Sequence, residues 1–399
     1  MAQQSILLLS GQAGWAGRVL SWRDHFDAHA CASAEEARAL LTGSRPWAVV
    51  LIDGADHGAD RDLIALARQA GARAVVVGAP PVSVDWLGLG AHAVLHPEFG
   101  PQEVFSVLAA DQSDGPSLPA PHSLLCVTGP GGTGASTVAV ALGQGLAGRA
   151  GHVLLADLRR HAELHALHHL DADGPGIDDL VQAHRTSSPD PLTLSELPPF
   201  VPRGYRLLGG LRRAVGWSSL RPRALAAAIH GLRAAYDVVV CDIDPDLEGE
   251  AEGGSFDVEE RNALARVAVA NATGVVVVGG PGAKGTHSLL RVLGEFWSHG
   301  VKPERTVVVV NRADRLSLDR LGVALGQLGA RDAATICLPE LDLETHLLSG
   351  APLPGAFVDP LTDAVLPLLA ERPPSAAPPA PQRIAPGSLG LRRTGDHEG

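Results

Sequence analysis

Short apolar runs alternate with amphipathic helical stretches along the first 110 residues. Apolar runs of this length, separated by helical patterns, are typical of the buried strands of a parallel sheet. Strands are predicted at Ile6–Leu9, His29–Cys31, Ala48–Ile52, Ala74–Val77 and Ala93–Leu95, and helices around Ala16–Arg23, Ala34–Leu41 and Asp60–Gln69. Ser33 and Glu36 have the spacing of a capping box at the start of the second helix. We therefore expect an α/β domain over residues 1–110.

The same alternation returns over residues 122–371, so a second parallel-sheet domain is expected there. Its strands are predicted at Leu124–Thr128, Val153–Asp157, Arg206–Leu208, Tyr236–Asp242, Gly274–Val278 and Thr306–Val310. Residues 111–121 are polar and rich in turn formers, which indicates a linker. Residues 372–399 are rich in proline, alanine and arginine, which predicts a disordered tail.

A glycine-rich stretch joins the strand at 124–128 to an alanine- and leucine-rich helix. Gly129 and Gly134 have the spacing of a phosphate-binding loop, and Ser136 stands where the hydroxyl of such a loop binds Mg²⁺. Ala135 occupies the place of the lysine that stabilises the transferred phosphoryl group. Backbone N–H groups and the helix N-terminus can hold a polyphosphate without that lysine, whereas hydrolysis loses a charged contact. The residues predicted to contact nucleotide are Gly129, Gly131, Gly132, Thr133, Gly134, Ala135, Ser136 and Thr137.

A second motif is the apolar strand that ends in Asp242. A carboxylate at the end of a buried strand is what the Mg²⁺ site of a phosphate-binding loop needs. Any buried strand that ends in aspartate would match this pattern on its own, but here the strand follows the glycine loop. We therefore expect Ser136 and Asp242 to hold Mg²⁺ together.

The stretch from Gly131 to Ala139 resembles the deviant Walker A loop of the MinD/ParA ATPases, and most closely their CpaE-like branch, in which the lysine before the serine is commonly replaced. The resemblance covers residues 122–371 and implies that the nucleotide is ATP. It also implies catalytic positions at Asp157 and Asp242, close to Mg²⁺ and the attacking water. The base is then expected to lie near Asn311 and Pro339.

Two further positions depart from the MinD/ParA pattern. Pro130 stands where MinD and ParA carry a signature lysine that reaches the nucleotide of a dimer partner. Arg159 replaces the second acid of the family's Asp-x-Asp, whose first acid is Asp157. These departures weigh against hydrolysis and ATP-driven dimerisation more than against binding, and they leave a homodimer open.

Residues 5–110 resemble the receiver domain of response regulators, which has a flavodoxin-like fold. Asp53 ends the third strand, where a receiver carries its phosphorylated aspartate. Ser10-Gly11-Gln12 stands in place of the acidic pair that holds Mg²⁺, and His96-Pro97 replaces the usual lysine and proline. We therefore expect a pseudo-receiver that docks or dimerises, as CpaE-like proteins carry ahead of their ATPase-like domain.

Composition and charge narrow the expected partners and compartment. The 399 residues carry a formal charge of −12, which argues against a general nucleic-acid binder. Cys31, Cys126, Cys241 and Cys337 form no C-x-x-C pair and are expected to be buried free thiols of a cytoplasmic protein. The run Ile6–Leu9 is too short for a signal peptide or a membrane span. No transmembrane segment is expected, and any membrane association would be made through partners.

Three polar clusters fit no motif. His161, His165, His168 and His169 have the spacing of one helix face, which we interpret as a solvated or partner-facing surface rather than a metal site. Six arginines are interpreted as a solvated loop, with an acidic partner, anionic lipid or DNA as alternatives. These are Arg203, Arg206, Arg212, Arg213, Arg221 and Arg223. An acidic run after Asp242, from Asp244 to Glu252, either repels nucleotide or forms a recognition loop.

The family resemblance implies a regulator of position in the cell. We expect a cytoplasmic protein that binds ATP with Mg²⁺ weakly and hydrolyses it slowly or not at all. Its partners would be proteins of the division septum, or of secretion or pilus assembly, and the sequence does not separate these roles. One alternative is an active ATPase with a dimerisation cycle, in which Arg159 supplies the missing cation. The other is a scaffold with a vestigial nucleotide site.

Overall fold

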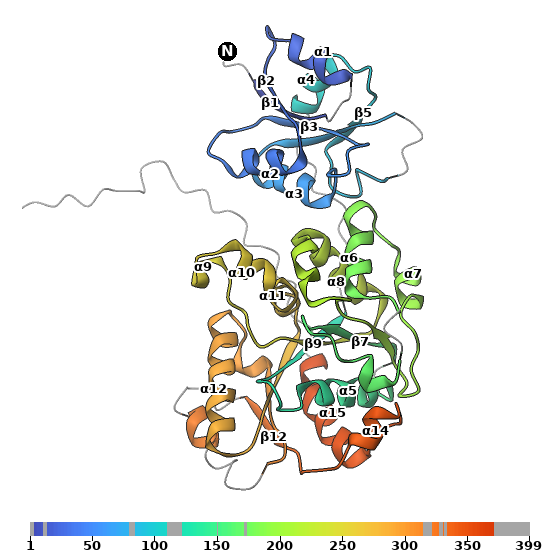
Figure 1. Cartoon of the computed structure of the whole chain (residues 1–399), viewed down its shortest axis with the longest axis vertical. Coiled ribbons are helices and arrows are strands. Elements are labelled where there is room, and N and C mark those ends of the chain that lie inside the picture. The colour runs from blue at the N-terminus through green and yellow to red at the C-terminus, as the bar shows by residue number, and fades with distance from the viewer. Residues whose placement is uncertain are drawn as a thin grey trace, which may run out of the picture.

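The chain folds into two α/β domains placed end to end (Figure 1). The computed structural model describes residues 4–10, 14–79, 84–109, 122–149, 151–170, 174–313, 321–326, 330 and 333–370. The linker predicted at 111–121 and the tail predicted at 372–399 lie outside these residues. Among the residues described, no helix combines the length and the apolar character that a membrane crossing requires.

The first domain is a five-stranded parallel sheet in the order β2-β1-β3-β4-β5. This is the strand order of flavodoxin-like folds, as the sequence predicts. All five predicted strands and all three predicted helices are present, with ends shifted by up to three residues. The elements are β1 (Gln4–Leu9), α1 (Trp15–Ser21), β2 (Phe26–Cys31), α2 (Ala34–Thr42), β3 (Val49–Asp53), α3 (Arg61–Gln69), β4 (Arg73–Val77), β5 (Ala93–Leu95) and α4 (Pro101–Ala109).

Alternation along β1 divides the core of this domain into two layers. Ile6 and Leu8 face one cluster, which includes side chains of α1 and α4, whereas Leu7 and Leu9 face the other, which includes α2 and α3. The capping of α2 differs in detail from the prediction. The Ser33 hydroxyl accepts the Glu36 N–H at 3.2 Å as expected, but the Glu36 carboxylate accepts the N–H of Ala32 at 2.7 Å.

The second domain contains a seven-stranded sheet in the order β12-β11-β10-β6-β9-β7-β8, with every pair parallel. Its strands are β6 (Ser123–Thr128), β7 (Val153–Leu158), β8 (Arg206–Leu208), β9 (Val238–Ile243), β10 (Gly274–Gly279), β11 (Thr306–Val310) and β12 (Ala334–Cys337). Its helices are α5 (Ala135–Ala147), α6 (Ile177–Thr186), α7 (Pro191–Glu196), α8 (Pro222–Ala235), α9 (Glu250–Gly253), α10 (Phe256–Arg261), α11 (Ala263–Ala270), α12 (Gly282–Ser298), α14 (Glu344–Leu348) and α15 (Gly355–Ala370). Three short 3₁₀ turns are also described, η1 (Ala166–His168), η2 (Ala214–Ser219) and η3 (Pro303–Arg305).

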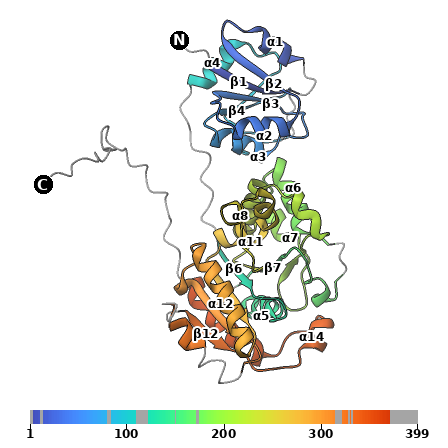
Figure 2. The ribbon, with the colours of Figure 1, turned by 60° about the vertical axis from the view of Figure 1, so that its left-hand side comes forward.

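Helices cover both faces of this sheet (Figure 2). Leu125 and Val127 pack into one core with α5 and α15, whereas Leu124 and Cys126 pack into the other with α6, α8, α11 and α12. β6 lies between β9 and β10 in the centre of the sheet. In open α/β sheets ligands bind beyond the carboxyl ends of the strands, so the turn after β6 occupies the position of a binding site.

All four cysteines are free thiols. Cys126 and Cys241 lie opposite each other on β6 and β9 and are fully buried, and burial raises the pKa of both thiols. Cys31 is also buried, but Cys337 is only half-buried. The prediction of burial is therefore wrong for Cys337, because β12 is the edge strand of its sheet.

Candidate nucleotide and magnesium site

The turn between β6 and α5 has the backbone geometry of a phosphate-binding loop. A Cβ at Gly129 would lie 2.2 Å from the carbonyl oxygen of Val278 on β10, so only glycine fits beside that strand. Gly134 adopts φ 87°, a left-handed conformation that L side chains rarely adopt, and it directly precedes α5. The loop therefore depends on the glycines that its sequence spacing predicts.

The backbone N–H groups of this loop have no acceptor within the described part of the chain. This holds for Gly131, Gly132, Gly134, Ala135, Ser136 and Thr137. Two carbonyl oxygens of the loop are instead occupied. The Asn311 amide donates to the Thr133 carbonyl at 2.9 Å, and the Arg312 guanidinium donates to the Gly132 carbonyl at 2.7 Å. Free N–H groups at the start of a helix favour an anion, so the predicted cradle is open rather than collapsed.

Two buried aspartates lie side by side at the ends of the neighbouring strands β7 and β9. Asp157 and Asp242 are paired in register and each is 1% exposed. Asp157 accepts backbone N–H groups of Arg159 at 3.2 Å and of Glu163 and Leu164 at 2.9 Å. Neither carboxylate oxygen of Asp242 has a hydrogen-bond partner among the described residues. Asp242 is therefore a buried carboxyl group that accepts no hydrogen bond, which is unusual in a folded protein, and its neighbouring cation is Arg159 at 3.6 Å.

Burial is the main cause of the unusual ionisation of both carboxyl groups. It raises the pKa of Asp242 to about 7 and that of Asp157 to about 6. The neighbouring Arg159 opposes this rise in both cases, and the Ser136 hydroxyl also lowers the pKa of Asp242. A divalent cation would replace the proton on Asp242 and pair the charge.

These groups fit the magnesium ion that the loop motif implies. Mg²⁺ prefers carboxylate, hydroxyl and water oxygens, and the orphaned Asp242 carboxylate lies close enough to the Ser136 hydroxyl for an electrostatic influence. Asp242 and Ser136 are the residues that would hold the ion. When bound, Mg²⁺ would neutralise charge on the phosphates.

From its place in the motif alone, Arg159 was a candidate for the missing cation, and the structure shows what its side chain contacts. Its Nη1 lies 3.6 Å from Asp242 Oδ1 and its Nη2 lies 3.6 Å from Asp244 Oδ1, with 19% of the side chain exposed. Arg159 is thus a mostly buried cation beside the carboxyl group of Asp242. Arg160 also pairs with Asp244 at 3.0 Å, so the start of the acidic run is neutralised.

A cavity of about 470 Å³ opens beside the loop, a size suited to a small-molecule ligand. Five of the residues predicted to contact nucleotide line it, namely Gly132, Gly134, Thr137, Asn311 and Pro339, which shows that they lie together. Its other wall carries apolar side chains that no motif indicated, including Leu167, Leu341, Leu343, Leu347 and Phe357. Arg312 also lines the cavity and has φ 55°, which is strained for a residue other than glycine. The sequence analysis did not assign Arg312 a role, although it follows Asn311 directly.

The prediction of a solvated histidine face is wrong. Within 161–170 only the short turn η1 is helical, because Glu163 and Leu164 turn inward to bind Asp157. His168 is 4% exposed, and its ring nitrogens bond the Leu164 carbonyl and the Tyr205 hydroxyl. Burial lowers the pKa of His168 to about 4, so the ring is neutral. Among the described residues no cluster of possible metal ligands is found.

The six arginines do not form one solvated loop either. Arg203 is 3% exposed and donates to the carbonyl groups of Leu167, His346 and Ala351. The others are distributed over separate contacts. Arg206 binds carbonyls near α7, Arg212 pairs with Asp179, and Arg221 pairs with Glu35 of the first domain. The six arginines therefore do not share one environment, because Arg203 is buried whereas Arg212, Arg213 and Arg223 are exposed.

Comparisons with known proteins find similarity only at the level of structure. A scan against protein-family models and a search of curated proteins give no match. Similar solved structures include a ParA family ATPase from Chlorobium tepidum TLS (17% identity, 60% of this chain and 97% of that chain, TM-score 0.49). They also include the cell division ATPase MinD of Pyrococcus furiosus (18% identity, 62% and 99%, TM-score 0.46). A third is a putative plasmid partition protein of Borrelia burgdorferi bound to AMPPNP (15% identity, 62% and 98%, TM-score 0.46).

Proposed function

We propose that the second domain binds ATP with Mg²⁺ and hydrolyses it slowly or not at all. In this proposal the protein is a cytoplasmic regulator that positions division or secretion machinery through protein contacts. The observation that carries the proposal is the pairing of an open N–H cradle with a buried carboxylate that accepts no hydrogen bond, Asp242, on the adjacent strand. An anion site and a cation site that meet at one sheet edge suit a magnesium-bound polyphosphate.

Slow turnover follows from what surrounds the loop. Ala135 and Pro130 offer no ammonium group at either lysine position of the MinD/ParA pattern. Removal of one such transition-state contact typically lowers the rate by about 10²–10³. Binding uses main-chain groups that remain in place, so affinity should be reduced less than turnover.

The test is calorimetric titration of the full chain with ATP and ADP, with and without Mg²⁺. We expect a micromolar dissociation constant for Mg·ATP, with phosphate release close to the uncatalysed background. Ser136→Ala should weaken binding by about tenfold, as expected for loss of a contact to a charged group. Ser298→Ala, at the end of α12, is the matched control and should bind as the unmodified protein does. Folded protein that binds no nucleotide would refute the proposal and favour the scaffold alternative.

Arg159 supports one second candidate, an active ATPase. Its guanidinium is a cation close to the expected metal ligand Asp242, where it could compensate for the missing lysine. This candidate predicts measurable ATP turnover that is lost in Arg159→Gln. Mass photometry with and without Mg·ATP would show whether turnover accompanies a dimerisation cycle.

A further inference from the structure

The first domain contacts the second through the start of α3, where Asp60 binds Arg185 of the second domain. Asp60 has no solvent exposure. One carboxylate oxygen caps α3 through the Leu63 N–H and binds Arg38 of α2, each at 2.9 Å. The other accepts Nη2 of Arg185, on α6 of the second domain, at 3.0 Å. A buried carboxylate thus joins the two domains through an ion pair.

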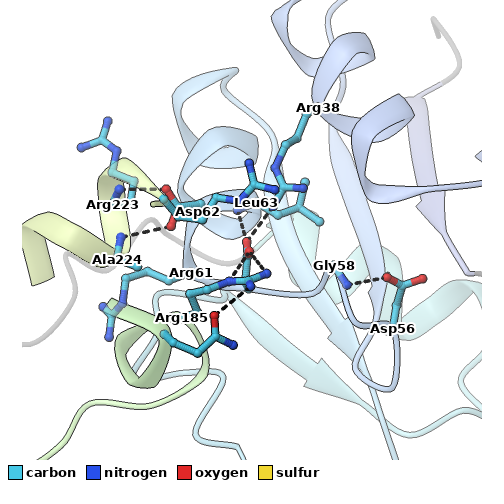
Figure 3. Close-up of polar contacts among 12 residues, drawn as sticks. Arg38, Asp56, Gly58, Arg61, Asp62, Leu63, Arg185, Arg223 and Ala224 are labelled. Carbon is cyan, nitrogen blue, oxygen red and sulfur yellow. Dashed lines mark hydrogen bonds and ion pairs between the residues drawn. The ribbon is translucent and has the colours of Figure 1, made fainter. Parts of the chain in front are cut away.

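The next two residues of α3 bind the ends of two helices in the second domain (Figure 3). Arg61 donates through Nε to the His184 carbonyl at 2.9 Å, in the last turn of α6. Asp62 accepts the backbone N–H groups of Arg223 and Ala224 at 2.8 and 3.0 Å, in the first turn of α8. Asp62 therefore caps α8 from the other domain. We call the contacts of Asp60, Arg61 and Asp62 with α6 and α8 the seam.

The charges of Asp60, Arg61 and Asp62 alternate in sign, and each is opposite to the charge of the group that it faces. Asp60 faces the cation of Arg185, Arg61 faces the negative end of α6, and Asp62 faces the positive end of α8. If the first domain were shifted by one residue along α3, these side chains would face groups of their own charge. This alternation selects one docked arrangement and would disfavour others.

α6 connects the seam to the nucleotide site. Its first residue, Ile177, donates to the Gly209 carbonyl at 2.9 Å. Gly210, which follows Gly209 in the chain, packs closely on Asp157. A Cβ at Gly210 would lie 3.1 Å from the carboxyl carbon of Asp157. The residues that wrap Asp157, from Arg159 to Leu164, precede α6 in the chain. One continuous set of contacts therefore runs from the paired aspartates to Arg61.

Arg159 determines the direction of the expected coupling. It pairs with Asp242 through its side chain and with Asp157 through its backbone N–H. Mg²⁺ on Asp242 would repel this guanidinium and displace it from the carboxylate. Displacement of Arg159 disturbs the segment that wraps Asp157, on which the start of α6 depends.

We propose that Mg·nucleotide binding loosens the seam and releases the first domain from α6 and α8. This inference rests on the nucleotide binding proposed above. Binding linkage is reciprocal, so a substitution that undocks the first domain should tighten nucleotide binding by up to the factor by which nucleotide weakens the seam. Only in the nucleotide-bound protein would the first domain be released and the surface of α6 and α8 that it covers become accessible.

The first experiment measures nucleotide affinity in seam variants of the full chain. Arg61→Gln and Arg185→Gln should each lower the dissociation constant for Mg·ATP by about fivefold or more, the usual lower bound of allosteric coupling. The matched control is Arg291→Gln, which breaks an exposed pair with Glu295 on α12 and should leave affinity unchanged. Equal or weaker affinity in the seam variants would overturn the proposal.

The second experiment needs no variant. Hydrogen–deuterium exchange of the unmodified chain should quicken at the start of α3, the end of α6 and the start of α8 when Mg·ATP is added, and remain unchanged in α12. Calorimetry on the same sample separates the two proposals. If Mg·ATP binds and exchange at the seam does not change, the coupling is wrong and the proposed function stands. If Mg·ATP does not bind, both are wrong.

Discussion

Replacement of Asp242 by asparagine should stabilise the metal-free protein at alkaline pH. Asp242 is 1% exposed, its oxygens have no hydrogen-bond partner, and Asp157 adds a second negative charge beside it. Asparagine has nearly the same shape as the carboxylic acid and carries no charge. The substitution therefore removes an unfavourable buried anion while keeping the packing.

The magnitude follows from the pKa of Asp242, which burial raises from 3.8 to about 7. Because the folded state favours the neutral acid, the stability that protonated Asp242 contributes is complete below about pH 4 and is lost as pH rises through about 7. At about 1.4 kcal/mol per pKa unit, ionisation costs up to about 4 kcal/mol at pH 8. The attraction of Arg159 is already contained in this pKa, so we expect about 2–4 kcal/mol in favour of Asp242→Asn.

The assay is thermal unfolding of both proteins in chelator at pH 5 and pH 8. For a domain of this size the gain corresponds to a rise in Tm of about 5–15 °C at pH 8, and to less than half of that at pH 5, where the carboxyl group of the unfolded chain is still ionised. Mg²⁺ should stabilise the unmodified protein at pH 8 and leave Asp242→Asn unchanged. Asp257→Asn, at an exposed position on α10, controls for general charge effects. A variant that is less stable at pH 8, or equally shifted at both pH values, would refute the reasoning.

Two further predictions concern ionisation and buried polar contacts. The affinity for Mg·ATP should increase from pH 6 to pH 8, because Mg²⁺ must displace the proton held by Asp242, whose pKa is about 7. Calorimetry over this pH range measures the change, and an affinity that does not vary with pH would mean that the site lies elsewhere. Arg203→Gln should lower the free energy of unfolding by about 2–4 kcal/mol, because carbonyl groups of Leu167, His346 and Ala351 lose their donors. Urea unfolding measures this loss, and Arg203→Lys should restore little of it if the fork of the guanidinium is required.

The sequence was sufficient for the sheets and for the loop, because both depend on local patterns. The apolar run before Gly129, the spacing to Gly134 and the acid at the end of β9 are all readable from neighbours in the chain. The relation of Asp157 to Asp242 was also accessible once both were placed at the ends of parallel strands. Helix and strand ends shifted by up to three residues because they depend on contacts that the apolar pattern does not encode.

Long-range partners explain what the sequence did not reveal. The histidine spacing suggested a helix, but the chain after β7 turns to satisfy Asp157, and His168 is carried into the core beside Tyr205. The arginine-rich stretch suggested one surface, but the acceptors of Arg203 are carbonyl groups 36 or more positions away in the chain. Asp62 had no signal at all, because its partners are backbone groups of another domain.

The seam also determines which positions at the domain contact can be substituted during evolution. On the second domain, the groups that receive Arg61 Nε and Asp62 belong to the main chain, so residues 184, 223 and 224 can vary without loss of these contacts, proline at 223 and 224 excepted. Side chains of the second domain enter the seam at two positions, where Arg185 binds Asp60 and the Ser188 hydroxyl accepts Arg61. The evolutionary constraint on the seam therefore concentrates in the tripeptide Asp60-Arg61-Asp62 and in these two residues. A chimera that exchanges the first domain should keep the seam if those positions are retained, together with the Glu35 that pairs with Arg221.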